Sequence, residues 1–331
     1  MKKMESIAIQ NDTDNQIISE EEIMTGQSKS PFIEANTKEV SLDYLKKDCI
    51  IPTFKDLECT LAHHEFIQTT EECVKSIFEG QQITKPVIRA SHKVLGRIPS
   101  AIDKPVKALL ENEKTQYFER MMFKIDVPSI NEIINGNSLN LSIIAVRAYN
   151  QENLYSNKNY EKFKIGIGFL NFVCTNMCLS SDGVVEELRA SSVKELKSKI
   201  TGVLSSYEIQ NHLNNLKLLS RYYLTEKQFA KFLGRCRMYY YLSKVERKQV
   251  PSLLLNDGQI NAVTKGYYED ENFSRNSDGT ISLWCLYNLL TGSVKSSYID
   301  TFLSRNVNAY ELVNELGISM KNNIPNWFLD N

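Results

Sequence analysis

Two apolar runs in the middle of the chain constrain the fold more than any other feature. The first extends from Leu139 to Arg147 and the second from Phe163 to Cys174. Both are alternating or continuously apolar, and both are rich in residues that fit the pleated surface of a sheet. The segment between them, Asn150 to Tyr160, contains four asparagines, which suit turns. The two runs therefore predict two central strands of a sheet.

Further strands are expected before these runs. The segment from Thr115 to Val127 alternates most clearly, although Glu119 falls on its apolar face. The segments from Leu57 to Gln68 and from Pro86 to Ile98 also read as extended, and Asn135-Gly136 predicts a tight turn. Consecutive strands with short connections are typical of antiparallel pairing. We therefore expect a central, mostly antiparallel sheet with helices on one face.

Helices are expected beside the first strands and throughout the C-terminal half. Thr69 and Glu72 form a capping box, which predicts the start of a helix, and an amphipathic helix is expected from Ala101 to Lys114. After Gly183 the pattern becomes helical, and no convincing strand follows Ser192. The expected helices of this half cover about 192–223, 225–242, 259–269, 281–290 and 297–316.

These patterns predict an α+β protein, in which a central sheet from Leu57 to Cys174 is followed by a helical C-terminal half. Residues 1–45 are expected to form a disordered or peripheral acidic tail, because the chain holds ten acidic residues against six lysines through position 48. Residues 46–183 would contain the sheet and residues 184–331 the helices. The pattern leaves open whether these two regions form one domain or two.

Composition and charge narrow the classes of protein further. Apolar residues make up 42% and charged residues 24% of the chain, which is typical of a globular protein. The net charge of −1 means that a local patch must select any charged partner. Seven cysteines occur singly, unlike a disulfide framework, and no stretch approaches the roughly 20 apolar residues of a membrane span. We therefore expect a cytoplasmic protein with no membrane partner.

A basic and aromatic stretch from Arg221 to Lys248 is the first candidate for a binding site. It holds eight basic residues against two acidic ones. On a helix, one side would be apolar, and Lys227, Lys231 and Arg235 would lie in a row on the opposite side. Such a row could meet phosphates while tyrosines stack on bases, but a solvated helix face explains the same pattern. The candidate nucleic-acid-binding residues are Arg221, Lys227, Lys231, Arg235, Arg237, Tyr239 and Tyr241.

Two glycines on one face of the second central strand are the next candidate. Gly166 and Gly168 follow Lys164 at alternate positions and leave a bare strip of backbone. A ligand or a packed helix could approach this strip closely, and a packed helix is the commoner cause of such a pattern. The stretch lacks the third glycine and the helix start of a dinucleotide-binding loop. The sequence therefore predicts a close-approach surface at these three residues.

Cysteine, histidine and carboxylate residues offer weaker candidates for chemistry. Cys174 and Cys178 would need two more ligands for a closed zinc site, and no second paired motif supplies them. We therefore expect no metal and no cofactor, and we assign no catalytic residue. An enzyme that uses a cysteine, or a carboxylate such as Glu119 with His92 and Arg120 close by, remains the alternative.

Several short segments resemble a known family. They are Gly96–Pro99, Glu113–Met121, Ile165–Phe169, Val173–Cys178, Gln228–Tyr239 and Lys295–Asp300. These segments resemble the family called domain of unknown function 3871, which is found in gut anaerobes and often near mobile elements. The segment Leu283–Asn288, together with Val173–Asn176, is more distantly similar to the phage/plasmid-like protein family. The resemblance implies a mobile-element context but supplies no catalytic residue and no cofactor.

These observations favour a non-catalytic nucleic-acid-binding accessory protein of a mobile element, with single strands as one possible ligand. The basic stretch carries this hypothesis. A protein-interaction module, such as a homo-oligomer, is the second hypothesis, and an enzyme with cysteine or glutamate chemistry is the third.

Overall fold

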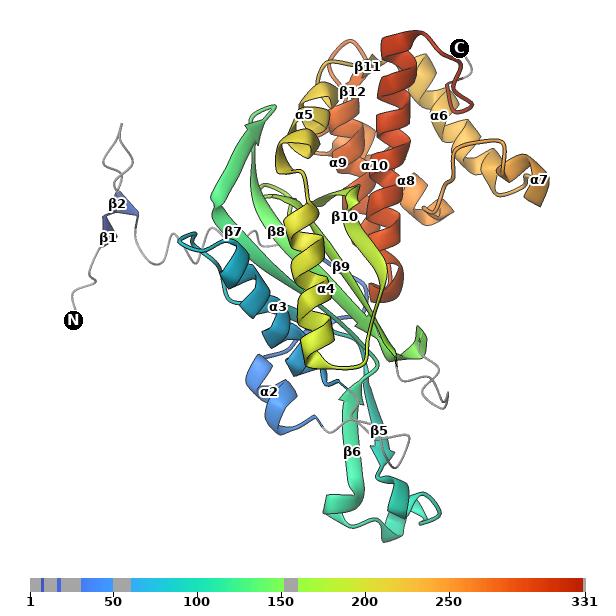
Figure 1. The fold of residues 1–331 in the computed structure, drawn as a ribbon. Helices are drawn as coiled ribbons and strands as arrows, with labels where there is room; N and C mark the ends of the chain where they lie inside the picture. Colours follow the sequence, from blue (N-terminus) through green and yellow to red (C-terminus); the bar gives the residue numbers. More distant parts are fainter. Residues whose placement is uncertain (1–6, 9–16, 19–30, 50–60, 152–159, 330–331) are drawn as a thin grey trace, which may run out of the picture.

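A six-stranded antiparallel sheet organises the fold (Figure 1). The computed structural model describes residues 7–8, 17–18, 31–49, 61–151 and 160–329. In the order in which they lie side by side, the strands are β3 (Lys38–Glu39), β4 (Val87–Ala90), β7 (Arg120–Ile134), β8 (Asn137–Ala148), β9 (Glu161–Asn171) and β10 (Met177–Ala190). Three two-stranded pairs accompany the sheet: β1 (Ile7–Ala8) with β2 (Ile17–Ile18), β5 (Lys93–Arg97) with β6 (Lys114–Phe118), and β11 (Tyr223–Leu224) with β12 (Ile281–Ser282).

The two apolar runs form adjacent central strands, as the sequence predicts. Strand β8 pairs with β7 on one side and with β9 on the other, and its side chains from Leu141 onward are buried on both faces. The predicted turn joins β7 to β8. Its residues Asn135 and Gly136 have φ angles of 49° and 79°, which the primed turns of hairpins require.

Nine helices are described, and several of them pack on the sheet. They are α2 (Leu42–Lys47), α3 (His63–Ile77), α4 (Val193–Ser206), α5 (Ile209–Leu219), α6 (Glu226–Tyr239), α7 (Lys244–Arg247), α8 (Asp257–Glu269), α9 (Leu283–Val294) and α10 (Ile299–Asn322), with 3-10 turns η1 (Pro99–Ala101), η2 (Val106–Ala108), η3 (Glu111–Glu113) and η4 (Tyr149–Gln151). In Figure 1, α3 and α4 lie in front of the sheet, and α10 runs behind β10. Phe66 of α3 packs its ring 5.4 Å from Phe123 and 4.7 Å from Phe163. The predicted α+β class is confirmed, but helices lie on both faces of the sheet and not on one as predicted, because α10 covers the face opposite α3.

The predicted strand from Leu57 to Gln68 is wrong where the structure describes it. Helix α3 begins at His63, and residues 57–60 lie outside the described part of the chain. The Glu65 carboxylate accepts a hydrogen bond from the Ala62 main-chain N–H at 2.6 Å, which caps the helix. Thr69 and Glu72, the predicted helix start, therefore lie inside α3. A short apolar run is compatible with both the strand period and the helix period, and here the helix cap at Ala62 decides for the helix.

The predicted helix from Ala101 to Lys114 is also wrong. This segment forms the 3-10 turns η1, η2 and η3 at the end of an arm built from β5 and β6, which projects from the body in Figure 1. Pro105 lies within the segment, and a proline disfavours the helical conformation of the residue before it. The arm leaves Leu95 78% exposed and Ile102 68% exposed.

The remaining differences concern places where elements end. The predicted strand from Thr115 to Val127 divides at Glu119, where β6 leaves the arm and β7 enters the main sheet. Strand β10 was not predicted, because its pairing with β9 shifts register between Leu179 and Val184 and hides the alternation. The predicted long helix 192–223 is two helices, α4 and α5, and the short β11 and β12 lie where no strand was expected.

Part of the predicted acidic tail packs onto the body. Phe32 and Ile33 are buried, and the Ser41 hydroxyl caps α2 by accepting a hydrogen bond from the Tyr44 N–H at 3.2 Å. One hydrophobic core includes residues from Phe32 to Leu329. No helix in the described part of the chain is long and apolar enough to cross a membrane.

Candidate functional site

Helices α6 and α7 carry the basic stretch on a lobe that projects from the body (Figure 1). Thr225 and Gln228 form a capping box at the start of α6, within the predicted helix 225–242. Phe229, Phe232 and Cys236 of α6 are buried against the core. The helix therefore presents its other side to solvent, as the apolar stripe predicts.

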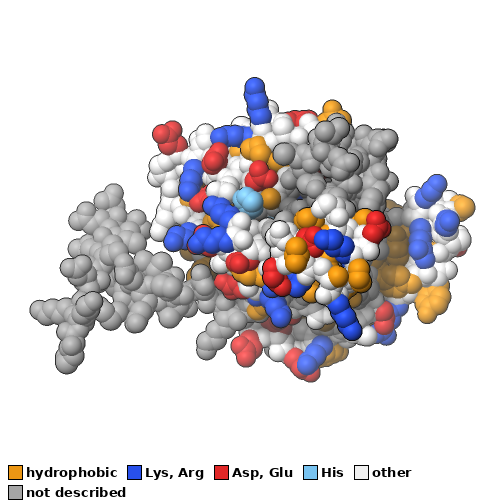
Figure 2. Space-filling model, turned by 90° about the horizontal axis from the view of Figure 1, so that it is seen from below, with side chains coloured by type: hydrophobic (Ala, Val, Ile, Leu, Met, Phe, Trp, Pro, Cys, Tyr) orange, Lys and Arg blue, Asp and Glu red, His pale blue; other side chains and the backbone are white. Residues whose placement is uncertain are grey.

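The solvent side of this lobe is basic. Lys227 and Lys231 are exposed along α6, and Lys244, Arg247 and Lys248 are exposed at α7. Tyr241 lies between the two helices with 91% of its surface exposed. Figure 2 shows basic and hydrophobic side chains gathered on this lobe, at the right of the view. We call the exposed side chains of residues 227–248 the basic lobe.

Three of the predicted binding residues are already engaged. The Arg235 guanidinium lies 5.0 Å from the ring centre of Trp327, and Arg237 pairs with Asp257 at 3.4 Å and donates to Asn261. The structure corrects the prediction for Tyr239, whose ring is buried and therefore unable to stack on a base. Position 239 follows 232 and 236 on the buried side of α6, where Trp327 meets it. Arg221 is exposed just after α5.

The two central glycines are covered by the neighbouring strand. A Cβ on Gly168 would lie 2.3 Å from the carbonyl oxygen of Cys178 and 2.9 Å from the side chain of Leu179. A Cβ on Gly166 would lie 3.2 Å from Val184. The close approach that the sequence predicts is therefore made largely by β10 of the same sheet.

Lys164 has a different environment from the glycines. Its half-buried ammonium donates to the main-chain carbonyl of Asp300, in the first turn of α10, at 2.8 Å. Lys164 also lines a cavity of about 270 Å³. The predicted surface thus divides into a closed part at the glycines and an open part at the lysine.

A polar cluster beside this cavity brings together the residues of the enzyme hypothesis. The carboxylate of Glu119 lies 3.8 Å from the His92 imidazole and 3.5 Å from the Arg120 guanidinium. Arg120 also lies 3.9 Å from the carboxylate of Asp300, and its guanidinium is 5.8 Å from the ring centre of Tyr298. The alternation of the sequence left Glu119 without an explanation, and the divided strand places it in this cluster.

The segment of Cys174 and Cys178, for which the sequence predicts no metal, forms a packed junction between the β9–β10 turn and α9. Burial raises the pKa of the Cys174 thiol to about 11, which opposes formation of a thiolate. Lys295 is buried here and donates to the carbonyl of Cys174 and to the Thr175 hydroxyl. The Asn176 side chain donates to the carbonyl of Asn288 at 2.8 Å. Segments that carry the family resemblance therefore meet in space at this junction.

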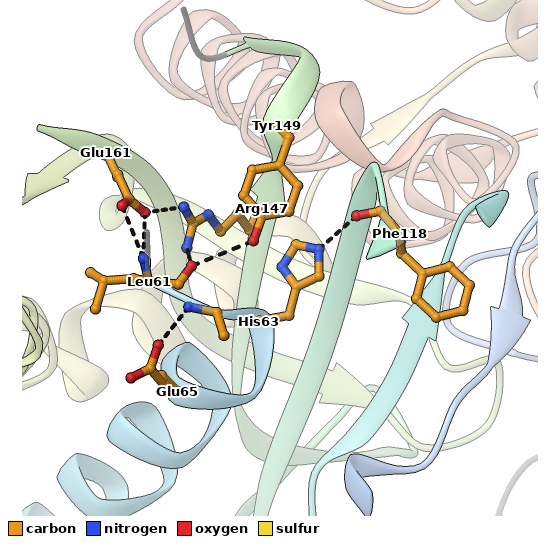
Figure 3. Close-up of polar contacts among 8 residues, drawn as sticks. Leu61, His63, Glu65, Phe118, Arg147, Tyr149 and Glu161 are labelled. Atoms are coloured by element: carbon orange, nitrogen blue, oxygen red, sulfur yellow. Dashed lines mark hydrogen bonds and ion pairs between the residues drawn. The ribbon is translucent and has the colours of Figure 1, made fainter. Parts of the chain in front are cut away.

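A second buried cluster ties α3 to the sheet (Figure 3). The guanidinium of Arg147 is fully buried, pairs with Glu161, and donates to the carbonyl of Leu61. The Glu161 carboxylate also accepts a hydrogen bond from the Leu61 N–H at 2.9 Å. The Arg147 guanidinium lies 4.6 Å and 4.4 Å from the ring centres of Tyr149 and Phe163. Burial raises the pKa of Glu161, and the charge of Arg147 opposes that rise.

His63 completes this cluster at the start of α3. Its Nε2 lies 2.8 Å from the carbonyl oxygen of Phe118, and its ring centre lies 4.6 Å from that of Tyr149. Burial, reinforced by the nearby charge of Arg147, lowers the pKa of His63 to about 3. The imidazole is therefore neutral at physiological pH. Successive residues of a strand lie on opposite faces, whereas the start of α3 buries His63 and leaves His64 partly exposed.

Few features of the sequence indicate this second cluster. The only indication is a charged residue beside each central apolar run: Arg147 ends the first run, and Glu161 lies just before the second. Among the residues that the structure describes, no group of three or more histidine, cysteine or acidic side chains could hold a metal ion.

Comparison with known proteins identifies the family. No curated protein sequence and no solved structure matches the chain. Residues 12–329 match the family described as "Domain of unknown function, B. Theta Gene description (DUF3871)". Because this match covers most of the chain, the protein belongs to the DUF3871 family.

Proposed function

We propose that the protein binds nucleic acid, without catalysis, through the basic lobe. The observation that carries the proposal is the exposure of several lysines and of Tyr241 on one projecting lobe. The stretch from Arg221 to Lys248 has eight basic residues and two acidic ones, while the whole chain has a net charge of −1. Positive charge is therefore concentrated where phosphates can reach it.

The arrangement favours single strands over duplexes. Tyr241, at 91% exposure, is free to stack on an unpaired base, and the lysines at 227, 231 and 244 can track the phosphates beside it. A role as an accessory protein of a mobile element is part of this proposal and is supported by the resemblance in sequence alone.

A protein interface on the same lobe is the second candidate. Val245 is 68% exposed and Met238 is 54% exposed beside Tyr241. Exposed apolar side chains at the centre of a polar rim are typical of interfaces between proteins. A partner recovered with the protein after nuclease treatment, and lost on Val245→Asp, would favour this candidate.

The test of the first candidate measures binding of labelled single-stranded and double-stranded DNA and RNA across a salt series. The variant replaces Lys227, Lys231 and Lys244 by Ala and leaves Arg235 in place, because Arg235 packs on Trp327. We expect the wild-type affinity to fall steeply with salt. The variant should bind much more weakly, and its salt dependence should be shallower, because fewer phosphates are neutralised.

The matched control replaces three exposed lysines elsewhere, Lys75, Lys107 and Lys321, by Ala. It removes the same charge, so a general electrostatic effect would weaken both variants equally. Equal weakening, or no binding by the wild type at low salt, would overturn the proposal. Tyr241→Ala adds a separate arm, which should weaken single-strand binding by about 1–3 kcal/mol.

A further inference from the structure

A cavity of about 270 Å³ lies on the sheet face that carries Lys164. Its lining consists of Val146, Ala148, Gln151, Lys162, Lys164 and Glu187. Val146 pairs with Lys164 across β8 and β9, and alternate residues of a strand share a face. The cavity therefore has an apolar base from β8 and a basic side from β9. It lies far along the chain from the basic lobe and shares no residue with it.

Two lysines and one carboxylate are among the described residues that line this cavity. Glu187 is the carboxylate in its lining, and it already pairs with Arg189 and with Lys162, the latter at 3.6 Å. The hydrogen bond from Arg189 is the largest cause that lowers the pKa of Glu187, so this carboxylate is ionised near neutral pH. One negative charge is thus shared between two cations.

Lys164 is left with a neutral acceptor. Its ammonium has three N–H donors, and the described contacts give it the carbonyl oxygen of Asp300. The nearby Asp300 carboxylate contacts Arg120 and the Asn150 amide through its Oδ2 atom, while its Oδ1 is buried without a hydrogen bond among the described residues. No carboxylate of the described residues forms an ion pair with Lys164. A half-buried cation in this state is stabilised when an anion joins it.

We propose that this cavity binds a small molecule that carries a carboxylate or phosphate group. Lys164 and Lys162 would hold the anionic group, and Val146 and Ala148 would contact an apolar part. The volume is close to the lower limit of about 300 Å³ for ligand pockets, so the ligand is small. The neighbouring cluster of Arg120, Glu119 and His92 is placed to contact a portion of the ligand that extends out of the cavity.

The test is isothermal titration calorimetry of the full chain with two probes, inorganic phosphate and acetate, at constant ionic strength. We expect saturable binding of at least one probe by the wild type. Lys164→Met should weaken this binding by at least about tenfold, which is the usual cost of losing a charged hydrogen-bond donor. Lys164→Arg, which retains the charge, should restore most of the binding. Lys75→Met, at an exposed lysine on α3, should leave it unchanged.

Two further variants separate this site from the basic lobe. Ala148→Leu should weaken binding of the probe by filling the cavity, and it removes no charge. The Lys227, Lys231 and Lys244 variant should bind the probe as the wild type does. Loss of probe binding in that variant would place the anion on the lobe and overturn the proposal. Absence of saturable binding by the wild type at millimolar probe would also overturn it, as would equal affinity in Lys164→Met.

Discussion

Arg147 and Lys164 are cations on adjacent strands of one sheet, yet they differ in burial and in the partners that neutralise their charge. Arg147, on the face that α3 covers, is fully buried between two aromatic rings and pairs with Glu161. Lys164, on the other face, is half buried and donates to one neutral carbonyl beside a cavity. The comparison teaches how a structural charge differs from one that is available for a ligand.

The difference lies in how completely each charge is satisfied. Burying a cation costs several kcal/mol, and a geometry with a carboxylate and further hydrogen bonds offsets this cost. The Arg147 cluster includes Glu161 and the carbonyl of Leu61, and thereby joins the start of α3 to β8 and β9. Lys164 joins the sheet to α10 through one hydrogen bond and keeps donor capacity. The first cation holds elements together, and the second is poised for an anion.

The largest expected effect comes from Arg147→Met. The variant retains an apolar stem but leaves Glu161 buried without its partner, so we expect a loss of about 3–5 kcal/mol in the free energy of unfolding. Chemical denaturation measures it. The double variant Arg147→Met with Glu161→Gln should recover part of the loss, because it no longer buries an unpaired charge. A single-variant loss below about 1 kcal/mol would place Arg147 in the same class as a surface cation.

The next largest effect is a pH dependence of the free energy of unfolding, caused by His63 in the Arg147 cluster. The His63 pKa falls from its ordinary value of 6.5 to about 3 in the folded protein. The unfolded chain therefore binds the extra proton first, and folding stability is lost as the pH falls below 6.5 towards 3. Linkage gives about 3 kcal/mol of this loss between pH 7 and pH 4.

His63→Gln should remove that component and flatten the stability profile between pH 6 and pH 4. Urea unfolding at a series of pH values measures the slope. His212→Gln is the matched control, because burial also lowers the pKa of His212, to about 4, at a place away from Arg147. The two variants should flatten the profile independently. An unchanged slope in His63→Gln would mean that His63 is not kept neutral by the fold.

The smallest expected effect is on the Lys164 side. Lys164→Met should change the free energy of unfolding by less than about 1 kcal/mol, because the variant removes one hydrogen bond and leaves no carboxylate without a partner. Lys124→Met provides the contrast on the same face. Lys124 pairs with Asp126, which is largely buried, so its loss should cost more. If Lys164→Met lowered the free energy of unfolding more than Lys124→Met, Lys164 would be a structural cation, and the proposed difference from Arg147 would be wrong.

The sequence predicts the surroundings of Lys164 better than the Arg147 cluster. It predicts β8 and β9 because their apolar runs carry a strong local signal, and it singles out Lys164 because the glycines follow it. It cannot predict the Arg147 cluster, which is assembled from Leu61, Arg147 and Glu161 after strand pairing and helix docking. The start of α3 shows the same limit, since a short apolar run with two histidines fits a strand or a helix equally well.

The basic lobe shows where a local pattern is sufficient and where it is not. The apolar stripe of α6 follows from spacing, and the structure bears it out. The spacing after Phe232 and Cys236 places Tyr239 on the buried side of α6, but the contact of its ring with Trp327 does not follow from spacing, because Trp327 comes from the far end of the chain. Contacts between segments that are distant in the sequence determine which aromatic side chains remain exposed and can contact a partner.

The edges of the sheet limit how copies of this chain can associate. Strand β3 presents two residues, and β10 is interrupted by two register shifts and lies against α10. Long, regular edge strands are the usual template for strand addition and aggregation, and neither edge offers one. Among the described residues, these two edge strands therefore offer another copy little continuous main-chain pairing. Side-chain surfaces are the alternative, and the arm formed by β5 and β6 exposes four apolar side chains, those of Leu95, Ile102, Val106 and Leu110.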